Sequence, residues 1–295
     1  MVKRTHGRPS LRWGWRRAVQ LWRLVGATWL VWMLAFAPAL LVLRTTVSSA
    51  LAAVPPGRGS APEGDIPLIV VDAARQILAP MGLAVASGFV VLWIWTVLWH
   101  AGVVSWQLWT GGRRVRLGEV LGLGLVAWWR YARLSLTAFG VLALAGVAWW
   151  LPLSTAIQSS YENMNEVRAL TLVAVGVVCT KLVVSLVWIV TLHGAWLLGL
   201  PEHRSAFLTW FRGAWSALRT PFKSLLTWLA WLIPAWLAAV APLVLGIRFG
   251  ELRGTVALTI FGVLAGLVRV FCWVGLFSSF APVTGLVGVA EEEEE

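Results

Sequence analysis

Long apolar runs separated by short polar segments dominate this chain. Six of the runs are long enough to cross a bilayer as helices, because a spanning helix needs about 20 residues. They cover residues 24–43, 77–100, 134–153, 169–200, 225–246 and 255–277. The pattern therefore predicts an all-α polytopic membrane protein whose residues 1–295 form a single membrane domain.

The longest run, residues 169–200, carries one formal charge, Lys181, near its middle. An ammonium group at that depth costs at least about 2.5 to 3.5 kcal/mol unless water, a carbonyl or an anion solvates it. Arg269 lies within the sixth run, nearer its inner end, where a long side chain can snorkel to the interface. Lys181 and Arg269 are therefore the candidate ligand- or anion-binding residues.

Three polar segments, residues 1–23, 116–133 and 202–224, are basic and rich in aromatic residues. Cations and indole rings both favour the headgroup region of a bilayer, so each segment is expected to form an interfacial helix on anionic lipid. In the first segment this helix should begin at about residue 11. Including the turn after the second run, the candidate lipid-binding residues are Arg16, Arg17, Arg23, Arg113, Arg114, Arg130, Arg133, Arg212, Arg219 and Lys223.

The distribution of cations predicts the orientation. If both termini lie inside, sixteen Lys and Arg residues fall in cytoplasmic segments, six in outer segments and two within spans. The positive-inside rule then places both termini in the cytoplasm, with 44–76 and 154–168 as outer loops and 278–295 as a cytoplasmic tail. The compact loops favour a bacterial inner membrane. Glu291–Glu295 is interpreted as a solvated acidic end or an artificial extension.

The first apolar run allows a second interpretation, as a signal peptide. Residues 49–52 (Ser-Ala-Leu-Ala) resemble the small-residue site of signal peptidase. The run is, however, about 20 residues long, which is the length of a spanning helix. Since no exported domain follows it, we interpret it as a retained span.

An internal repeat emerges when Arg23, Arg130 and Arg219 are set in register. Each copy would comprise a basic, Trp-rich interfacial helix, a span, a loop and a returning span, giving three parallel hairpins. Chance alignment of apolar segments is the alternative. Nine residues after the arginines lie Trp32, Phe139 and Trp228, and fifteen residues after them lie Pro38, Ala145 and Pro234.

Two of these segments carry a resemblance to a known family. Arg116-Leu117-Gly118-Glu119 leads through Trp129-Arg130 into a span, and residues 212–223 do the same. This arrangement resembles the membrane-domain proteins related to the membrane part of glycerophosphoryl diester phosphodiesterases. In those proteins the enzymatic domain is separate and it has no counterpart here, so the resemblance implies no activity and transfers no functional residue.

The amino-acid composition argues against several classes of protein. Charged residues make up 13% of the chain, about half the share in an ordinary soluble domain. The net charge is +11, but the basic residues flank apolar runs and do not form a soluble basic face. No nucleic-acid partner is therefore expected. Cys179 and Cys272 both lie inside apolar runs, which predicts no disulfide.

Recognisable catalytic chemistry is missing from the sequence, which contains no HExxH, GxSxG or phosphate-loop pattern and no metal-ligand cluster. We therefore expect no catalytic residue, metal or cofactor. His100 and His193 fall near the inner ends of two runs, but haem ligation would require them to face one another, and interfacial histidines bonded to carbonyls or water are favoured. Gly262 and Gly266 form a GxxxG pattern that allows close helix packing, within the chain or in a dimer.

The sequence favours a non-catalytic accessory or scaffold subunit of a membrane assembly, in contact with anionic lipid and with a membrane-protein partner or a second copy. The alternative is a transporter or permease that moves an anionic or lipidic substrate past Lys181 and Arg269. A transporter should enclose a polar cavity that reaches Lys181. A scaffold should instead pack tightly inside and expose an apolar surface to its partner.

Overall fold

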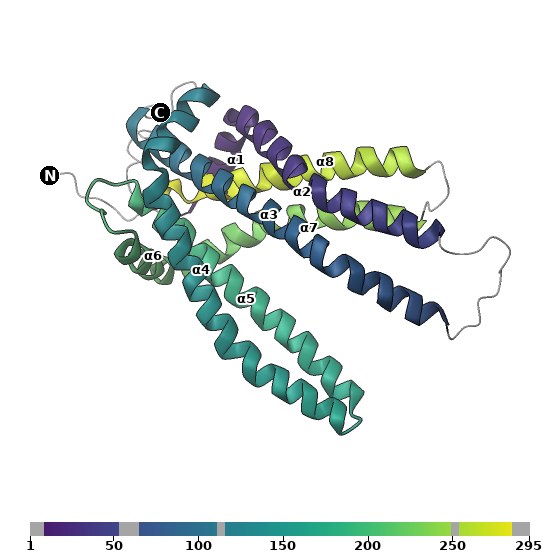
Figure 1. Ribbon diagram of the computed structural model, residues 1–295. Helices are drawn as coiled ribbons and strands as arrows, with labels where there is room; N and C mark the ends of the chain where they lie inside the picture. Colours follow the sequence, from purple (N-terminus) through teal and green to yellow (C-terminus); the bar gives the residue numbers. More distant parts are fainter. Residues whose placement is uncertain (1–8, 53–64, 111–115, 249–253, 285–295) are drawn as a thin grey trace. The chain divides into compact units, whose positions relative to one another are not determined.

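The fold is seen in a computed structural model, which describes residues 9–52, 65–110, 116–248 and 254–284. Of these residues 92% are helical and none lies in a strand, so the all-α prediction is confirmed (Figure 1). Arg113, Arg114 and most of the predicted tail lie outside the described residues. The helices are α1 (Leu11–Gln20), α2 (Trp22–Ala52), α3 (Asp65–Thr110), α4 (Leu117–Glu162), α5 (Glu166–Leu198), α6 (Ala206–Arg219), α7 (Pro221–Arg248) and α8 (Gly254–Ser279), followed by the 3-10 helix η1 (Ala281–Thr284).

Five segments of the described residues are long and apolar enough to cross a membrane, as expected of a multi-pass membrane protein. The fifth predicted span, 225–246, lies on α7 but is not among them, so the number of six spans stays a prediction. The five segments are Trp22–Val42, Ala79–Leu108, Leu117–Glu162, Glu166–Leu198 and Gly262–Val283.

Helix α4 is longer than the sequence predicted at both ends. It is continuous from Leu117 to Glu162, so the basic segment before the third span is not a separate interfacial helix. The outer loop predicted after this span is also reduced to a short turn, because α4 continues to Glu162, and the hydroxyl groups of this segment bond to helix carbonyls one turn back without ending the helix. Ser154 donates to the Leu151 carbonyl at 2.9 Å, and Ser160 donates to the Ala156 carbonyl at 2.8 Å.

The predicted repeat is therefore uneven in the structure. Short basic helices, α1 and α6, precede α2 and α7, but α4 has no such partner. The break between α6 and α7 has a clear cause. Thr220 precedes Pro221, and a residue before proline disfavours the helical conformation whereas proline suits the first helical position. No proline lies between residues 116 and 133, so α4 meets no such break.

The outer loop 44–76 is also partly helical, because α2 continues to Ala52 and α3 begins at Asp65. The residues between these two helices lie outside the described part of the chain. The described helices divide into two compact units. The smaller unit, residues 26–96, is a hairpin of α2 and α3 in which the Trp95 indole donates to the Thr28 hydroxyl at 3.0 Å.

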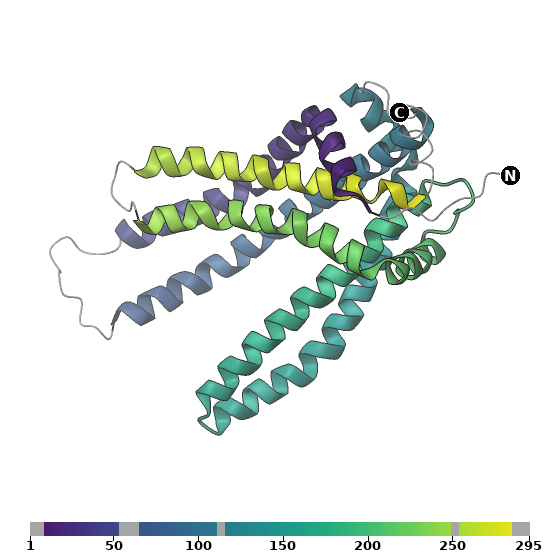
Figure 2. The ribbon, with the colours of Figure 1, turned by 180° about the vertical axis from the view of Figure 1, so that it is seen from behind.

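The larger unit contains α1, the end of α3, helices α4 to α8 and η1. In Figures 1 and 2 its two hairpins, α4–α5 and α7–α8, meet near α6 and diverge from there. The five largest of the fully buried side chains are all tryptophan or phenylalanine. They are Trp99, Trp106, Trp196, Phe277 and Phe280.

The α4–α5 turn contains Met164, which has a φ of 52° and is 91% exposed. This left-handed conformation disfavours any residue with a Cβ atom. Replacing Met164 with glycine is expected to raise the free energy of unfolding by about 0.5 to 1 kcal/mol. Glycine relieves the backbone strain of the folded state, and the greater backbone entropy of glycine in the unfolded state offsets part of this gain. Denaturant unfolding in detergent micelles measures the change. Met164→Ala, which keeps the Cβ atom, is the control, and an equal gain in both variants would contradict this explanation.

Candidate functional site

The meeting point of the helices is built around Phe277 of α8. The His100 ring stacks on it with centroids 3.9 Å apart, Trp99 packs edge-on at 5.2 Å, and Trp196 lies at 5.3 Å. The Trp196 indole also donates to the Phe277 carbonyl at 2.8 Å. These contacts join α3, α5 and α8 through rings that are almost completely buried, and we call this group the aromatic hub.

A buried histidine network lies beside the aromatic hub. His193 of α5 contacts Ser216 of α6 through Nδ1 at 3.0 Å and Ser224 of α7 through Nε2 at 2.9 Å. The Ser224 hydroxyl in turn lies 3.2 Å from the Thr220 hydroxyl. Both ring nitrogens therefore bond to hydroxyl groups, which leaves none to ligate a haem iron. The arrangement joins three helices and makes His193 a structural residue of the interior.

Tight helix contacts occur at glycines other than the predicted pair. A Cβ added at Gly102 of α3 would overlap the Val120 carbonyl oxygen, and one at Gly124 of α4 would overlap that of Leu98. A Cβ at Gly213 of α6 would lie 2.7 Å from the Gly194 nitrogen of α5. At Gly262 it would meet no described atom within 4 Å. Glycines without the GxxxG spacing thus mark several close contacts between described helices.

Lys181 points toward an aromatic ring. Its Nζ atom lies 5.8 Å from the centre of the Trp236 ring of α7. A cation over an indole face is attracted to it by about 0.5 to 2 kcal/mol, which partly offsets the cost of the charge in a bilayer. Arg269 is exposed on α8. Trp236 was not singled out in the sequence, because only the fold brings α5 and α7 together.

A double-mutant cycle tests this cation–π contact. Trp236→Leu is expected to lower the free energy of unfolding more in the native chain than in the Lys181→Met variant, by about 0.5 to 2 kcal/mol. Unfolding in detergent gives the four values of the cycle. Trp149, an exposed tryptophan of α4, is the matched control. Equal effects of Trp236→Leu in both backgrounds would show that Lys181 does not interact with the ring.

Most of the predicted lipid-binding residues remain available to headgroups. Within α4 and α6 a guanidinium lies over the tryptophan four residues earlier in the chain, at 5.0 Å for Arg133 and 5.3 Å for Arg219. Cations and indoles stacked in this way are suited to the interface. The exposed members of the predicted set are Arg16, Arg23, Arg133, Arg212, Arg219 and Lys223.

Two predicted lipid-binding residues have internal roles instead. Arg17 is only 8% exposed, and its guanidinium lies between Trp13 and Trp106 and donates to Gln20 at 2.6 Å. Arg130 donates from Nη2 to the Leu198 carbonyl at 3.0 Å and to the His203 carbonyl at 2.8 Å. It thereby satisfies a carbonyl at the end of α5, where a cation is favourable to the helix dipole.

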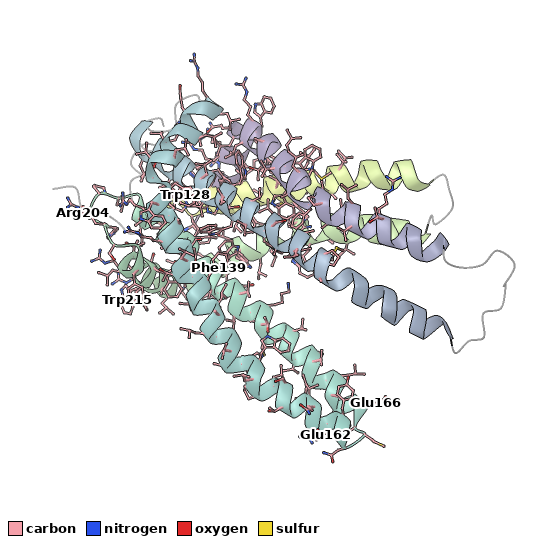
Figure 3. All side chains as sticks on the ribbon, viewed as in Figure 1. Trp128, Phe139, Glu162, Glu166, Arg204 and Trp215 are labelled. Carbon is pink, nitrogen blue, oxygen red and sulfur yellow. The ribbon has the colours of Figure 1, made fainter. Side chains whose placement is uncertain are left out.

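The α4–α5 hairpin has chemically distinct ends. Glu162 and Glu166 lie at its tip, whereas Arg204 and Trp215 lie beyond the opposite end, near α6 (Figure 3). Arg168 also lies at the tip and Glu202 at the opposite end, but cations outnumber acidic residues only in the segment 202–223. The orientation in which this end faces the cytoplasm stays a prediction.

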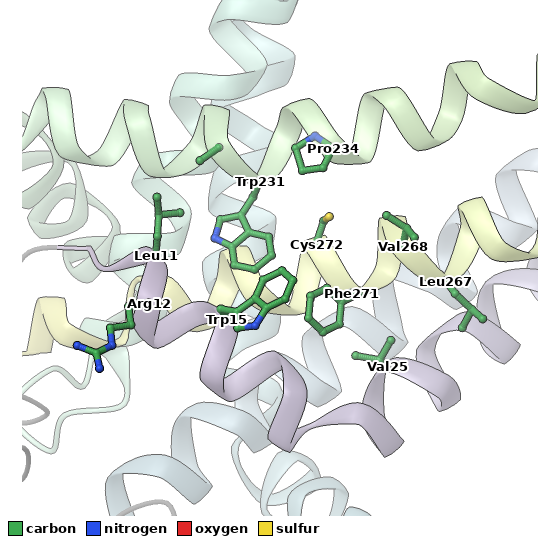
Figure 4. Close-up of a pocket in the computed structure, with 11 residues that line it drawn as sticks. Leu11, Arg12, Trp15, Val25, Trp231, Pro234, Leu267, Val268, Phe271 and Cys272 are labelled. Atoms are coloured by element: carbon green, nitrogen blue, oxygen red, sulfur yellow. The ribbon is translucent and has the colours of Figure 1, made fainter. Parts of the chain in front are cut away.

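An apolar pocket opens between α1, α7 and α8 (Figure 4). Its volume is about 750 Å³, within the range of ligand sites. Arg12 is the only charged residue among those that line it, and neither Lys181 nor Arg269 does so. The remaining lining is aliphatic and aromatic, with the thiol of Cys272.

Comparisons with known proteins give no match from which a function could be inferred. No family model, no curated protein and no solved structure matches the chain. Within the described residues, no group of three or more His, Cys, Asp or Glu side chains is placed to hold a metal ion. The features that remain for function are the exposed basic helices, the uncovered apolar faces of the hairpins and the pocket.

Proposed function

We propose that the protein is a non-catalytic accessory or scaffold subunit of a membrane assembly. In this proposal the α4–α5 hairpin docks a partner membrane protein, and the basic aromatic segments hold the cytoplasmic end on anionic lipid. The assembly belongs to a bacterial inner membrane, with both termini of the chain in the cytoplasm.

This proposal rests on the unequal burial of the spanning helices. Only 11% of the most apolar stretch of α4 is buried, against 50% for that of α8. The described part of α8 is thus half buried, whereas α4 and the outer face of α5 present most of their apolar side chains to whatever surrounds them. Such a surface must be covered by lipid tails or by another protein.

Small residues on α4 favour a protein as the covering partner. Gly140, Ala143, Leu144 and Val147 are exposed and share one face of the helix, which we call the α4 stripe. A Cβ added at Gly140 would meet no described atom within 4 Å, so this glycine serves no described contact within the chain. Small residues let a neighbouring helix approach closely in a bilayer, where close packing drives association.

The surroundings of Lys181 give less support to a transporter. The ammonium faces the Trp236 ring, and the apolar pocket involves neither Lys181 nor Arg269. A pathway for an anionic substrate would need a polar cavity that reaches these cations. Uptake of an anion that disappears in Lys181→Met, with the fold intact, would support transport instead.

Photo-crosslinking in native membranes tests the scaffold proposal. A photoreactive amino acid at Leu144 is expected to give one discrete protein adduct, whereas the same residue at Leu264, exposed on α8, gives none. Ala143→Trp should abolish the adduct, because a bulky side chain fills the α4 stripe. An adduct of twice the chain's mass would identify the partner as a second copy. Lipid adducts alone from Leu144 would contradict the proposal.

A further inference from the structure

Three aromatic rings form the inner wall of the pocket between α1, α7 and α8. Trp15 stacks on Trp231 with centroids 6.1 Å apart and planes 19° apart, and it meets Phe271 edge-on at 5.1 Å. Trp15 is nevertheless 60% exposed, so one side of this aromatic wall faces outward. The wall is therefore rigid and apolar, and it is reachable from the surroundings of the protein.

The charge of the pocket is confined to one end. Figure 4 shows Arg12 at the edge of the pocket with its guanidinium directed away from the aromatic rings, while Pro234 and Leu267 lie toward the other end. Arg16, one turn further along α1, is also exposed. An amphiphile whose charged end is anionic matches this division, because its apolar part would lie along the wall and its charge beside the guanidinium.

The direction of the pocket matches that of a lipid in the cytoplasmic leaflet. From Cys272 to Leu267 its wall follows α8 for about 7.5 Å, at 1.5 Å a residue, within the candidate span Gly262–Val283. With the end of α8 on the cytoplasmic side, Arg12 lies at headgroup depth and the apolar wall extends toward the bilayer centre. In this orientation the acyl chains of the surrounding bilayer have direct access to the opening.

We propose that the pocket binds one acyl chain of an anionic phospholipid, whose phosphate contacts Arg12. The inference rests on the proposed contact with anionic lipid and gives that contact a defined site. The aromatic wall selects an acyl chain by shape and burial, and Arg12 selects an anionic headgroup by charge. The site joins α1 to the α7–α8 hairpin, so the bound lipid becomes part of the interface between these helices.

Photoactivatable phospholipids test the site. The full-length chain is reconstituted in vesicles that contain trace phospholipids with a diazirine in mid-chain, carrying either an anionic glycerol or a zwitterionic choline headgroup. Adducts are mapped by mass spectrometry. We expect adducts on Trp231, Val268 and Phe271, about fivefold more abundant for the anionic lipid, as one arginine–headgroup attraction predicts. Arg12→Gln should abolish the preference, whereas Arg168→Gln, which removes an exposed arginine at the tip of the α4–α5 hairpin, should leave it unchanged.

Variants that fill the pocket test the role of its shape in lipid binding separately from the role of its charge. Val268→Trp, with Ala230→Leu as a milder second variant, keeps Arg12 and should reduce pocket adducts severalfold for both lipids. Adducts spread evenly over the exposed helices, or an anionic preference unaltered in Arg12→Gln, would overturn the proposal, as would a crosslinked dimer that occupies the pocket. A missing protein adduct at Leu144 would refute the scaffold proposal alone, because the lipid adducts are measured on the isolated chain.

Discussion

Replacing His193 with leucine is expected to lower the free energy of unfolding by about 2 to 4 kcal/mol. The substitution removes a partner of Ser216 and one of the partners of Ser224, whose hydroxyl groups lie at 3.0 and 2.9 Å from the ring nitrogens, and leaves Ser224 with Thr220. A buried polar group left without a partner costs about 1 to 3 kcal/mol. Leucine also cannot join α5 to both α6 and α7 by polar contacts. Denaturant unfolding in detergent micelles measures the loss.

Two further variants show whether the histidine network causes the loss. The triple variant His193→Leu, Ser216→Ala, Ser224→Ala removes all three polar partners, so it should recover part of the stability lost in the single variant. His203→Leu removes only an exposed contact between the His203 ring and Arg212, so it should change stability by less than about 1 kcal/mol. A triple variant as unstable as the sum of its single variants would mean that the three residues do not act as a network.

Replacing Gly124 with alanine is expected to lower the free energy of unfolding by about 1 to 3 kcal/mol. The added methyl group would overlap the Leu98 carbonyl oxygen, so α3 and α4 would have to move apart. Backbone atoms cannot yield as the end of a flexible side chain can. The loss should exceed the gain of about 1 kcal/mol that alanine brings to a helix interior. Unfolding in detergent measures the balance.

Gly122, two residues earlier on the same helix, provides the matched control. A Cβ there would meet no described atom within 4 Å, so Gly122→Ala should raise stability by up to about 1 kcal/mol through helix propensity alone. The two substitutions are chemically identical and differ only in the neighbouring helix. If both variants gained stability, the close approach of α3 and α4 at Gly124 would be ruled out.

Hydrophobic patterning predicted the helices well because a bilayer imposes a simple length and composition on each span. The apolar runs all fall on helices, and the amphipathic segment from residue 11 is α1. The pattern failed where a polar segment continues a helix. The composition of residues 154–162 suggests a loop, yet α4 includes them, and hydroxyl groups there bond to helix carbonyls without ending the helix.

The sequence predicted those features of the candidate site that depend only on the charge of a residue and its depth in a span. Lys181 was identified as an unusual cation, but its partner Trp236 depends on the approach of α5 and α7. Arg17 and Arg133 are both arginines four residues after a tryptophan, yet only Arg17 is buried. Which face of a helix meets its neighbours is a property of the tertiary fold, and it separates structural cations from those free to contact headgroups.

Cysteine labelling from the two sides of the membrane tests the central claim, that the α4–α5 hairpin crosses the bilayer with its basic aromatic end in the cytoplasm. Single cysteines are placed at Met164 and at Ser205 in a chain with Cys179 and Cys272 replaced by serine, and intact cells are treated with a membrane-impermeant maleimide. The account predicts labelling at residue 164 before lysis and at residue 205 only after lysis. Labelling of both positions from the same side, or of residue 205 alone in intact cells, would contradict it.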